Sequence, residues 1–210
     1  MLRRTTMLAS LGLFTLLLTR GKLQIWMFVI LASVFLALVL GRFFCGWLCP
    51  INTFIELGTW LKKKLGLKNH TPSFLQNSLW GYALLLLVIG GFLLSRLTGK
   101  NIPLLLFMIP LGAIISFTFS PAAWHHWLCP YNVLFKITGG WSLLRMAVGE
   151  QCTGCTRCQK VCPAEAITLE QGKAKIDNAH CLICTACQGV CPAQAINYGR
   201  FKEFQETQAS

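Results

Sequence analysis

The first two thirds of the chain consist mainly of long apolar stretches separated by short polar ones. Four apolar runs occupy residues 7–18, 23–40, 79–94 and 103–119. The last three approach the roughly 20 residues that an α-helix needs to cross a bilayer. The first is shorter and follows two arginines, as in a signal peptide, but no small-x-small cleavage site comes after it. Residues 19–22 instead indicate a tight turn, so the pattern predicts about four transmembrane helices.

Two further stretches, 51–65 and 131–145, are amphipathic and predict helices that lie in the membrane interface. Both are preceded by the same element, Trp-Leu-Cys-Pro-x-Asn, so this half of the chain contains an internal repeat. The proline of each element suits the first turn of a helix, where a missing N–H costs nothing. We therefore expect Cys49 and Cys129 at or near the N-caps of the two interfacial helices.

The composition is that of a basic membrane protein, with a mean hydropathy of +0.56 and a formal net charge of +12. Its basic residues flank apolar helices rather than form a patch on a soluble face, which argues against nucleic-acid binding. The loops expected on one side contain Arg3, Arg4, Arg42, Lys62, Lys63, Lys64 and Lys68, against Arg20, Lys22, Arg96 and Lys100 on the other. The positive-inside rule then predicts a multi-pass protein of the bacterial cytoplasmic (inner) membrane, with both termini and the C-terminal domain in the cytoplasm.

The C-terminal part of the chain contains the cysteine run C-x2-C-x2-C-x3-C-P twice. This run is typical of bacterial ferredoxins with two clusters, in which the fourth cysteine of each run binds the other cluster. We assign one 4Fe-4S cluster to Cys152, Cys155, Cys158 and Cys191, and the second to Cys162, Cys181, Cys184 and Cys187. Zinc sites usually pair two cysteines with two distant ones, and disulfides need an oxidising compartment, so both alternatives fit the pattern poorly.

These elements predict an α-helical membrane domain, with about four transmembrane and two interfacial helices, followed by an α+β ferredoxin-like domain with two clusters. We place the membrane domain at residues 1–148, the ferredoxin domain at 149–198 and a tail at 199–210.

A third metal site is a further hypothesis. If the two repeats face one another, Cys45, Cys49, His125 and Cys129 converge as three sulfurs and one imidazole, a set suited to a 2Fe-2S centre or Cu(I). Plain packing explains membrane-edge cysteines equally well. The nearby aromatic residues could line a quinone headgroup site or form an aromatic belt without a ligand; they are Phe43, Phe44, Trp47, Trp124 and Trp127.

The chain resembles the NapH-type quinol dehydrogenase subunits and the wider group of membrane ferredoxins. The resemblance rests on Gly41-Arg-Phe-Phe-Cys45-Gly-Trp-Leu-Cys49-Pro50, on the second Cys129-Pro130 element and on the two cysteine runs. It implies a four-helix membrane anchor with two cytoplasmic 4Fe-4S clusters, which takes electrons from quinol and passes them to partner redox proteins. The chain departs from the family in having His125 where a cysteine is usual, and in a very short loop between its first two helices.

We therefore expect a membrane-bound iron–sulfur protein that relays single electrons between the quinone pool and a partner redox protein, as a subunit of a quinol dehydrogenase or related oxidoreductase complex. Its partners would be membrane lipid, quinone and the redox partner. Two alternatives are a cupric (metal) reductase and a redox-linked assembly or regulatory membrane anchor. No residue is assigned a catalytic role, and the chain has no G-x-G-x-x-G motif for a nucleotide.

Overall fold

The computed structural model describes residues 2–22, 24–67, 70–99 and 104–200. Lys68, Lys100 and the tail from residue 201 onward lie outside the described residues. The chain divides into two compact units. The helical unit comprises Met1–Ile30 and Trp47–Leu134, and the cysteine-rich unit comprises Leu31–Gly46 and Phe135–Ser210. The second half of an apolar helix thus belongs to the cysteine-rich unit, whereas the sequence pattern assigned residues 1–148 to one membrane domain.

The helical unit begins with α1 (Leu2–Thr19), which a tight turn joins to α2 (Gln24–Leu40). Gly21 is left-handed, with φ of 65°, and the backbone N–H of Lys22 donates to the Leu17 carbonyl at 2.9 Å. This pattern is the usual glycine-dependent end of a helix. Phe14 and Trp26 then meet edge to face, with ring centroids 5.3 Å apart, so the two helices pack directly after the turn.

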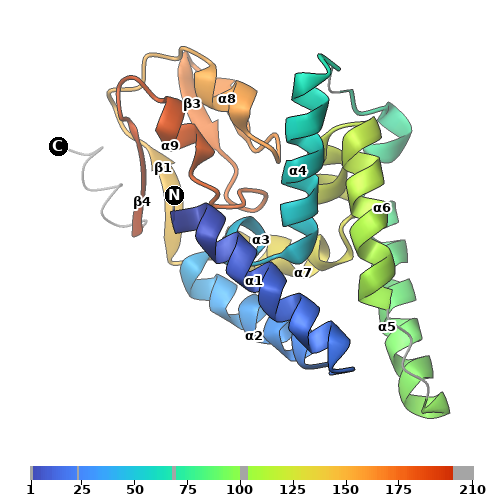
Figure 1. Ribbon diagram of the computed structural model, residues 1–210. Coiled ribbons are helices and arrows are strands. Elements are labelled where there is room, and N and C mark those ends of the chain that lie inside the picture. The colour runs from blue at the N-terminus through green and yellow to red at the C-terminus, as the bar shows by residue number, and fades with distance from the viewer. Residues whose placement is uncertain (1, 23, 68–69, 100–103, 201–210) are drawn as a thin grey trace. The chain divides into compact units, whose positions relative to one another are not determined.

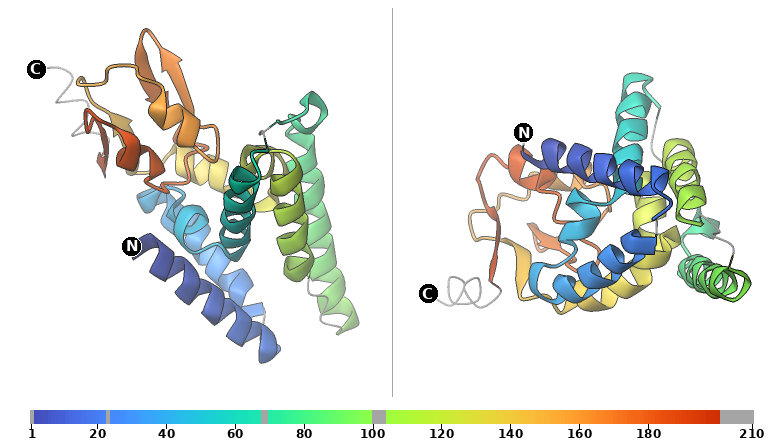
Figure 2. Two further views of the ribbon diagram at one scale, coloured as in Figure 1. Left: turned by 45° about the horizontal axis from the view of Figure 1, so that its top comes forward. Right: turned by 60° about the horizontal axis from the view of Figure 1, so that its bottom comes forward.

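The rest of the helical unit consists mainly of helices and includes a π-helical turn. It contains α4 (Pro50–Lys64), η1 (Ser73–Leu75), α5 (Leu79–Thr98), α6 (Leu104–Thr118) and the π-helical turn η2 (Ala123–Leu128). Helices α5 and α6 run side by side, and α4 packs against α6 (Figures 1 and 2). A Cβ atom on Gly112 would lie 2.9 Å from both Ile51 and Trp124. The missing side chain therefore lets α4 and η2 approach α6 closely.

Both Cys-Pro elements begin a helix, as the sequence predicts. Cys49 is the N-cap of α4, and Cys129 directly precedes Pro130, the first residue of α7 (Pro130–Gly140). The predicted helix at 131–145 is wrong at its C-terminal end, because α7 ends at Gly140 and residues from Leu144 form a strand. Two consecutive glycines weaken the helix there, and the strand gains a partner strand later in the chain.

Within the described residues, one helix is both long and apolar enough to cross a membrane, namely α5. Only 11% of its apolar window is buried. Two shorter apolar helices cover Ile25–Leu40 and Leu106–Thr118. The helical N-terminal region is therefore confirmed, and the four predicted spans are not.

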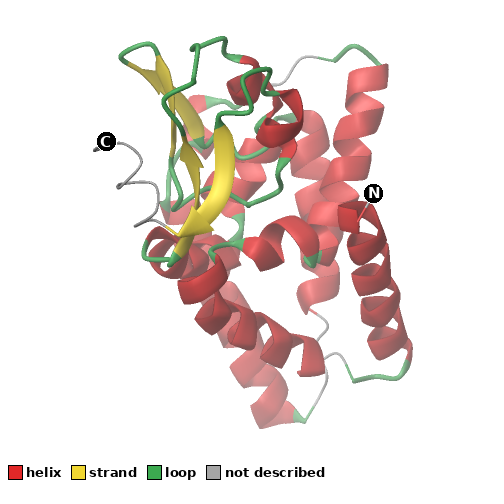
Figure 3. Cartoon of the chain, turned by 90° about the vertical axis from the view of Figure 1, so that its left-hand side faces the viewer, coloured by secondary structure: helices red, strands yellow, loops and turns green. Residues whose placement is uncertain are grey.

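The cysteine-rich unit has two small antiparallel sheets and several short helices (Figure 3). Strand β1 (Leu144–Val148) pairs with β4 (Ile196–Arg200), and β2 (Ile167–Glu170) pairs with β3 (Lys173–Ile176). The helices α8 (Arg157–Val161) and α9 (Ala186–Val190) each follow a cysteine loop, and the division of the chain into units falls within α3 (Phe43–Trp47), after Gly46. The core contains Met146, Ile167, Ile183 and Ile196 together with cysteines, so the ligand loops are part of the hydrophobic core.

Candidate functional site

Eight cysteines line two separate cavities of the cysteine-rich unit. We name site one the cavity lined by Cys152, Cys155, Cys158 and Cys191, and site two the cavity lined by Cys162, Cys181, Cys184 and Cys187. Each has about 350 Å³ of space, counting its open mouth. The fourth cysteine of each run lines the other cavity, as the assignment from the cysteine runs requires, and the binding of a cluster by each set stays a prediction.

The backbone of the ligand loops repeats the duplication seen in the sequence. Left-handed residues occur in equivalent pairs, namely Gly154 and Ile183, Thr156 and Thr185, and Glu165 and Gln194. Non-glycine residues rarely adopt this conformation, and a β-branched residue such as Ile183 adopts it least readily. Left-handed positions bend a chain sharply, so both loops turn three cysteines toward one cavity at the cost of local strain.

Backbone N–H groups also point at the sulfur atoms. Ala166 donates to Cys162 Sγ and Ala195 donates to Cys191 Sγ, both at 3.4 Å, in equivalent positions of the two repeats. A third donor, the N–H of Ala174, lies 3.4 Å from Cys152 Sγ. Such hydrogen bonds stabilise the negative charge of cluster ligands and tune reduction potentials. Four thiols per cavity and N–H donors aimed at sulfur fit a 4Fe-4S group in each site.

Burial raises the pKa of thiols in both sites, including Cys158 in site one, but the effect is larger in site two. Burial raises the pKa of Cys181 and of Cys187 to about 12, with neighbouring thiolates as a further cause. In contrast, a backbone N–H from Arg157 is the main cause that lowers the pKa of the exposed Cys155 in site one. Since iron binds thiolates, loading of site two must displace protons that its buried thiols otherwise hold.

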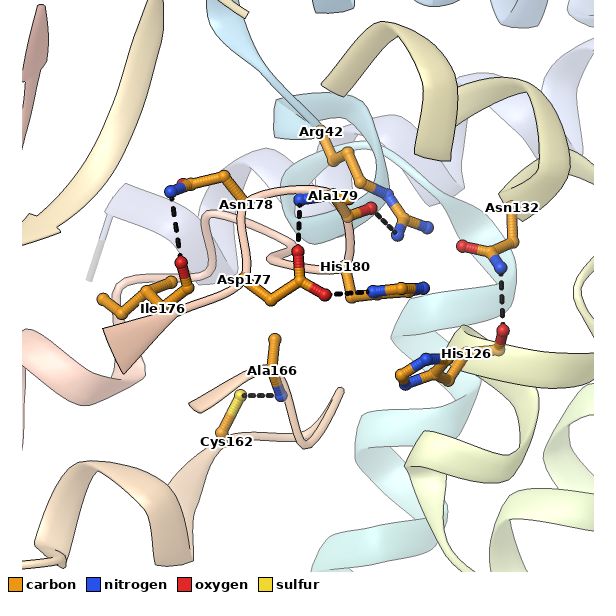
Figure 4. Close-up of polar contacts among 10 residues, drawn as sticks. All are labelled: Arg42, His126, Asn132, Cys162, Ala166, Ile176, Asp177, Asn178, Ala179 and His180. Carbon is orange, nitrogen blue, oxygen red and sulfur yellow. Dashed lines mark hydrogen bonds and ion pairs between the residues drawn. The ribbon is translucent and has the colours of Figure 1, made fainter. Parts of the chain in front are cut away.

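The loop before Cys181 is held by side chains that the sequence did not single out. Asn178 Oδ1 accepts from the N–H of Met146 at 3.0 Å, and its Nδ2 donates to the Met146 carbonyl at 3.1 Å. Asp177 contacts His180 Nδ1 at 2.5 Å (Figure 4). Arg42 donates from Nη1 to the carbonyl of Ala179 at 2.9 Å (Figure 4).

Arg42 is buried, with only 2% of its surface exposed. The charge pattern counted it among the basic loop residues on the cytoplasmic side, and that side stays a prediction. The one available signal in the sequence was the position of Arg42 directly after an apolar helix. A basic residue at the end of any transmembrane helix occupies the same position, so this signal did not indicate burial. Its partner, Ala179, lies 137 residues away in the sequence.

The four residues of the hypothetical third metal site are divided between the two units. Cys49, His125 and Cys129 belong to the helical unit, and Cys45 belongs to the cysteine-rich unit. Burial raises the pKa of Tyr131, and the charges of Cys129 and Cys49 add to this effect. Among the described residues, no group of three or more His, Cys, Asp or Glu side chains surrounds a position for a single metal ion; this includes the cysteines of sites one and two, which line cavities large enough for a cluster.

Several residues considered for a quinone headgroup site take part in packing within their own units. Phe44 stacks on Phe135 with ring centroids 6.0 Å apart, and Trp124 is 1% exposed. Trp127 stacks on His126 at 4.4 Å. Packing therefore accounts for these three aromatic side chains.

A shallow basic hollow opens on the surface of the cysteine-rich unit beside site one. It is lined by Arg157, Lys160, Val161, Gly189, Val190, Cys191 and Pro192. Both cations are exposed, and Cys191 is also one of the four cysteines of site one. The hollow thus links a positively charged surface to a ligand of that site.

Two protein-family models match this chain. A family model described as a 4Fe-4S binding domain matches residues 23–68 and 101–148, which contain one Trp-Leu-Cys-Pro element each. A second model, described as a 4Fe-4S dicluster domain, matches residues 146–204. The chain is therefore a ferredoxin-type iron–sulfur protein with a helical N-terminal region.

Similar proteins narrow this class. The methylamine utilization ferredoxin-type protein MauN of Methylobacillus flagellatus is 31% identical over 59% of this chain and 48% of its own length. The ferredoxin-type protein NapH of Haemophilus influenzae is 26% identical over 70% of this chain and 56% of its own. An uncharacterised protein of Methanocaldococcus jannaschii is 29% identical over 71% and 61%, respectively.

The relatives named NapH and MauN, together with the two 4Fe-4S family models, identify the chain as a NapH-type ferredoxin protein. It spans about half to three fifths of the length of these curated relatives. No solved structure matches it.

Proposed function

We propose that this protein is a membrane-anchored electron relay, which transfers single electrons between the quinone pool and a partner redox protein through two 4Fe-4S clusters. The observation that carries the proposal is the pair of four-cysteine cavities in one compact unit. Two one-electron carriers in one unit suit a donor that gives up two electrons and an acceptor that takes one at a time. The ligands are Cys152, Cys155, Cys158 and Cys191 for site one, and Cys162, Cys181, Cys184 and Cys187 for site two.

Membrane anchoring is supported by the apolar surface of the helical unit. Leu86 of α5 and Phe107 of α6 are 69% and 63% exposed, and α5 is long enough to span a bilayer. Large exposed apolar surfaces of this kind mark contact with lipid or another protein. Our proposed arrangement has four spans in the bacterial inner membrane, with both termini and the cysteine-rich unit in the cytoplasm.

In the proposed reaction, a quinol is oxidised to quinone and releases two protons and two electrons. The two electrons pass singly through the chain to the partner, and each reduces one equivalent of an oxidised redox centre there. The protein's contribution is ligation by thiolates, burial and N–H donors that set the potentials.

The basic hollow beside site one suggests an acidic surface on the partner protein. Charge complementarity of this kind speeds association, and salt screens it. We therefore expect electron transfer to the partner to slow as ionic strength rises.

The proposal is tested with the purified, iron-loaded protein in lipid nanodiscs under anaerobic conditions. Addition of a ubiquinol or menaquinol analogue should reduce the protein, seen as the appearance of reduced 4Fe-4S signals in EPR spectra. A matched sample in which the quinol has been replaced by quinone should stay oxidised. Reduction by dithionite but by neither quinol, with all iron present, would rule the quinol relay out.

The arrangement of Cys45, Cys49, His125 and Cys129 gives no support to a cupric reductase. Replacing two of these cysteines tests directly whether they hold a third metal centre. We expect a Cys49→Ala, Cys129→Ala variant to retain about eight irons per chain, as two 4Fe-4S clusters require. Iron, acid-labile sulfide and copper are measured in both proteins after anaerobic purification. A loss of iron or copper in the variant alone would establish a third centre at these cysteines.

A further inference from the structure

The two duplicated ligand loops are unequal in polarity. Site one has Thr153 and Gly154 between its first two cysteines, whereas site two has Leu182 and Ile183 at the equivalent positions. Leu182 and Ile183 are 2% and 4% exposed, while Cys155 of site one is exposed. The site-one loop thus faces solvent, and the site-two loop is covered.

The covering segment is residues 41–46, which follow the apolar helix α2 and belong to the same compact unit. A Cβ atom on Gly41 would lie 2.5 Å from the end of the Ile183 side chain, and one on Gly46 would overlap the Leu182 carbonyl oxygen. Cys45 packs against the small cluster of Ala164, Ala166 and Leu182, as do three cysteines of site two. Gly46 has no room for a side chain against this backbone, and Gly41 has a left-handed φ of 63°, which other residues rarely adopt.

The same segment places a buried cation at site two. Arg42 donates to the Ala179 carbonyl at 2.9 Å, two residues before the ligand Cys181, and its stem lies against Gly139. The guanidinium also acts electrostatically on the thiol of Cys45. Arg42 is always protonated, so a full positive charge is enclosed at this loop.

A buried charge acts strongly because little water screens it. A 4Fe-4S cluster with four thiolates is anionic and gains one more negative charge on reduction, so a nearby cation stabilises the reduced form. This effect raises the reduction potential. Burial and net charge are among the factors that spread 4Fe-4S potentials over a wide range.

We propose that Arg42 raises the reduction potential of the cluster in site two above that in site one, and that electrons from the membrane side are received at site two. The assignment of a quinol as the reductant rests on the proposed function. A quinol is a mild reductant, so the receiving site needs a raised potential. One electron enters at site two as the donor is oxidised by one electron, and it leaves from site one to the oxidised partner.

The test is a redox titration of the full-length, iron-loaded protein in detergent, monitored by EPR. In the native protein, the higher of the two potentials should belong to site two; Cys184→Ser and Cys155→Ser variants, each altering one site, make this assignment. In Arg42→Gln, the site-two potential should become more negative while the site-one potential stays unchanged. Arg42→Lys, which keeps the charge, should restore most of the native value.

Arg157→Gln is the matched control, because it removes the same charge from the exposed loop of site one. Solvent screens that charge, so its effect on either potential should be smaller. The proposal is overturned if Arg42→Gln binds all its iron and leaves the site-two potential unchanged, or if it shifts both potentials equally. If the Arg42→Gln protein fails to bind iron, the two reduction potentials of the native protein test the proposal instead. A higher reduction potential for site one than for site two then overturns the proposal.

A purely structural role for Arg42 predicts another pattern, in which the Gln and Lys variants lose iron alike and the remaining potentials do not move. The titration uses chemical reductants, so it does not depend on quinol. Quinol could fail to reduce the protein while Arg42→Gln still shifts the site-two reduction potential as expected. This result would reject the quinol relay and support the role of Arg42.

Discussion

Replacing Gly154 with alanine is expected to empty site one and leave about four irons per chain, those of site two. Gly154 lies between two ligands of site one and is left-handed, with φ of 65°. An added Cβ atom would overlap the carbonyl oxygen of Gly172. The backbone must move to relieve this contact, and Cys152 and Cys155 move with it. Iron and acid-labile sulfide analysis measures the loss, and EPR of the reduced protein shows which signal disappears.

Gly172→Ala is the matched control for this variant. Gly172 is also left-handed, with φ of 77°, but a Cβ atom there meets nothing within 4 Å. The control therefore carries the conformational cost of an alanine in this region, about 1–2 kcal/mol, without the overlap. Full iron content in both variants would show that the site-one loop tolerates the overlap and would contradict the expectation.

Replacing Gly46 with alanine is expected to affect site two in the same way. Its Cβ atom would overlap the Leu182 carbonyl oxygen and would lie 3.4 Å from the backbone nitrogen of Cys184. Both atoms belong to the backbone, so no side-chain rotation relieves the contact. We expect the 41–46 segment to separate from the loop, with loss or slow formation of the site-two cluster and an unchanged site one.

The comparison for Gly46→Ala is Gly58→Ala, within α4. A Cβ atom on Gly58 meets nothing within 4 Å, and alanine is favoured over glycine inside a helix by about 1 kcal/mol. This control should keep all its iron and unfold at the same or a slightly higher temperature. A Gly46→Ala protein with both clusters intact would show that the site-two cluster does not depend on close contact between the 41–46 segment and the loop, and would contradict the expectation.

Much of the candidate site could be predicted because its signals are local in the sequence. Three cysteines spaced by two residues must face one side of a short loop, and the fourth is followed by proline, so the two ligand sets follow from spacing and duplication. The helix starts after Cys49 and Cys129 could also be predicted, because proline fits the first turn whatever surrounds it.

Other features depend on contacts between distant segments and left no clear local signal. The predicted amphipathic helix at 131–145 includes the first two residues of the strand Leu144–Val148. The strand is recognised only from its pairing with Ile196–Arg200. Similarly, Cys45 and Cys49 are neighbours in the sequence, yet they belong to different compact units. No spacing rule could divide the hypothetical third site in this way.

The sequence by itself determined the cofactor chemistry, the apolar character of the first half and the kinship with NapH-type proteins. The two ligand runs share the same cysteine spacing and differ in sequence at Thr153-Gly154 and Leu182-Ile183. Only the tertiary structure decided what covers each loop. A segment that follows an apolar helix lies on the site-two loop and buries Arg42 there, through a hydrogen bond between residues 137 positions apart. Burial of a charge is a property of the whole packed unit, since only distant segments can exclude the water around it.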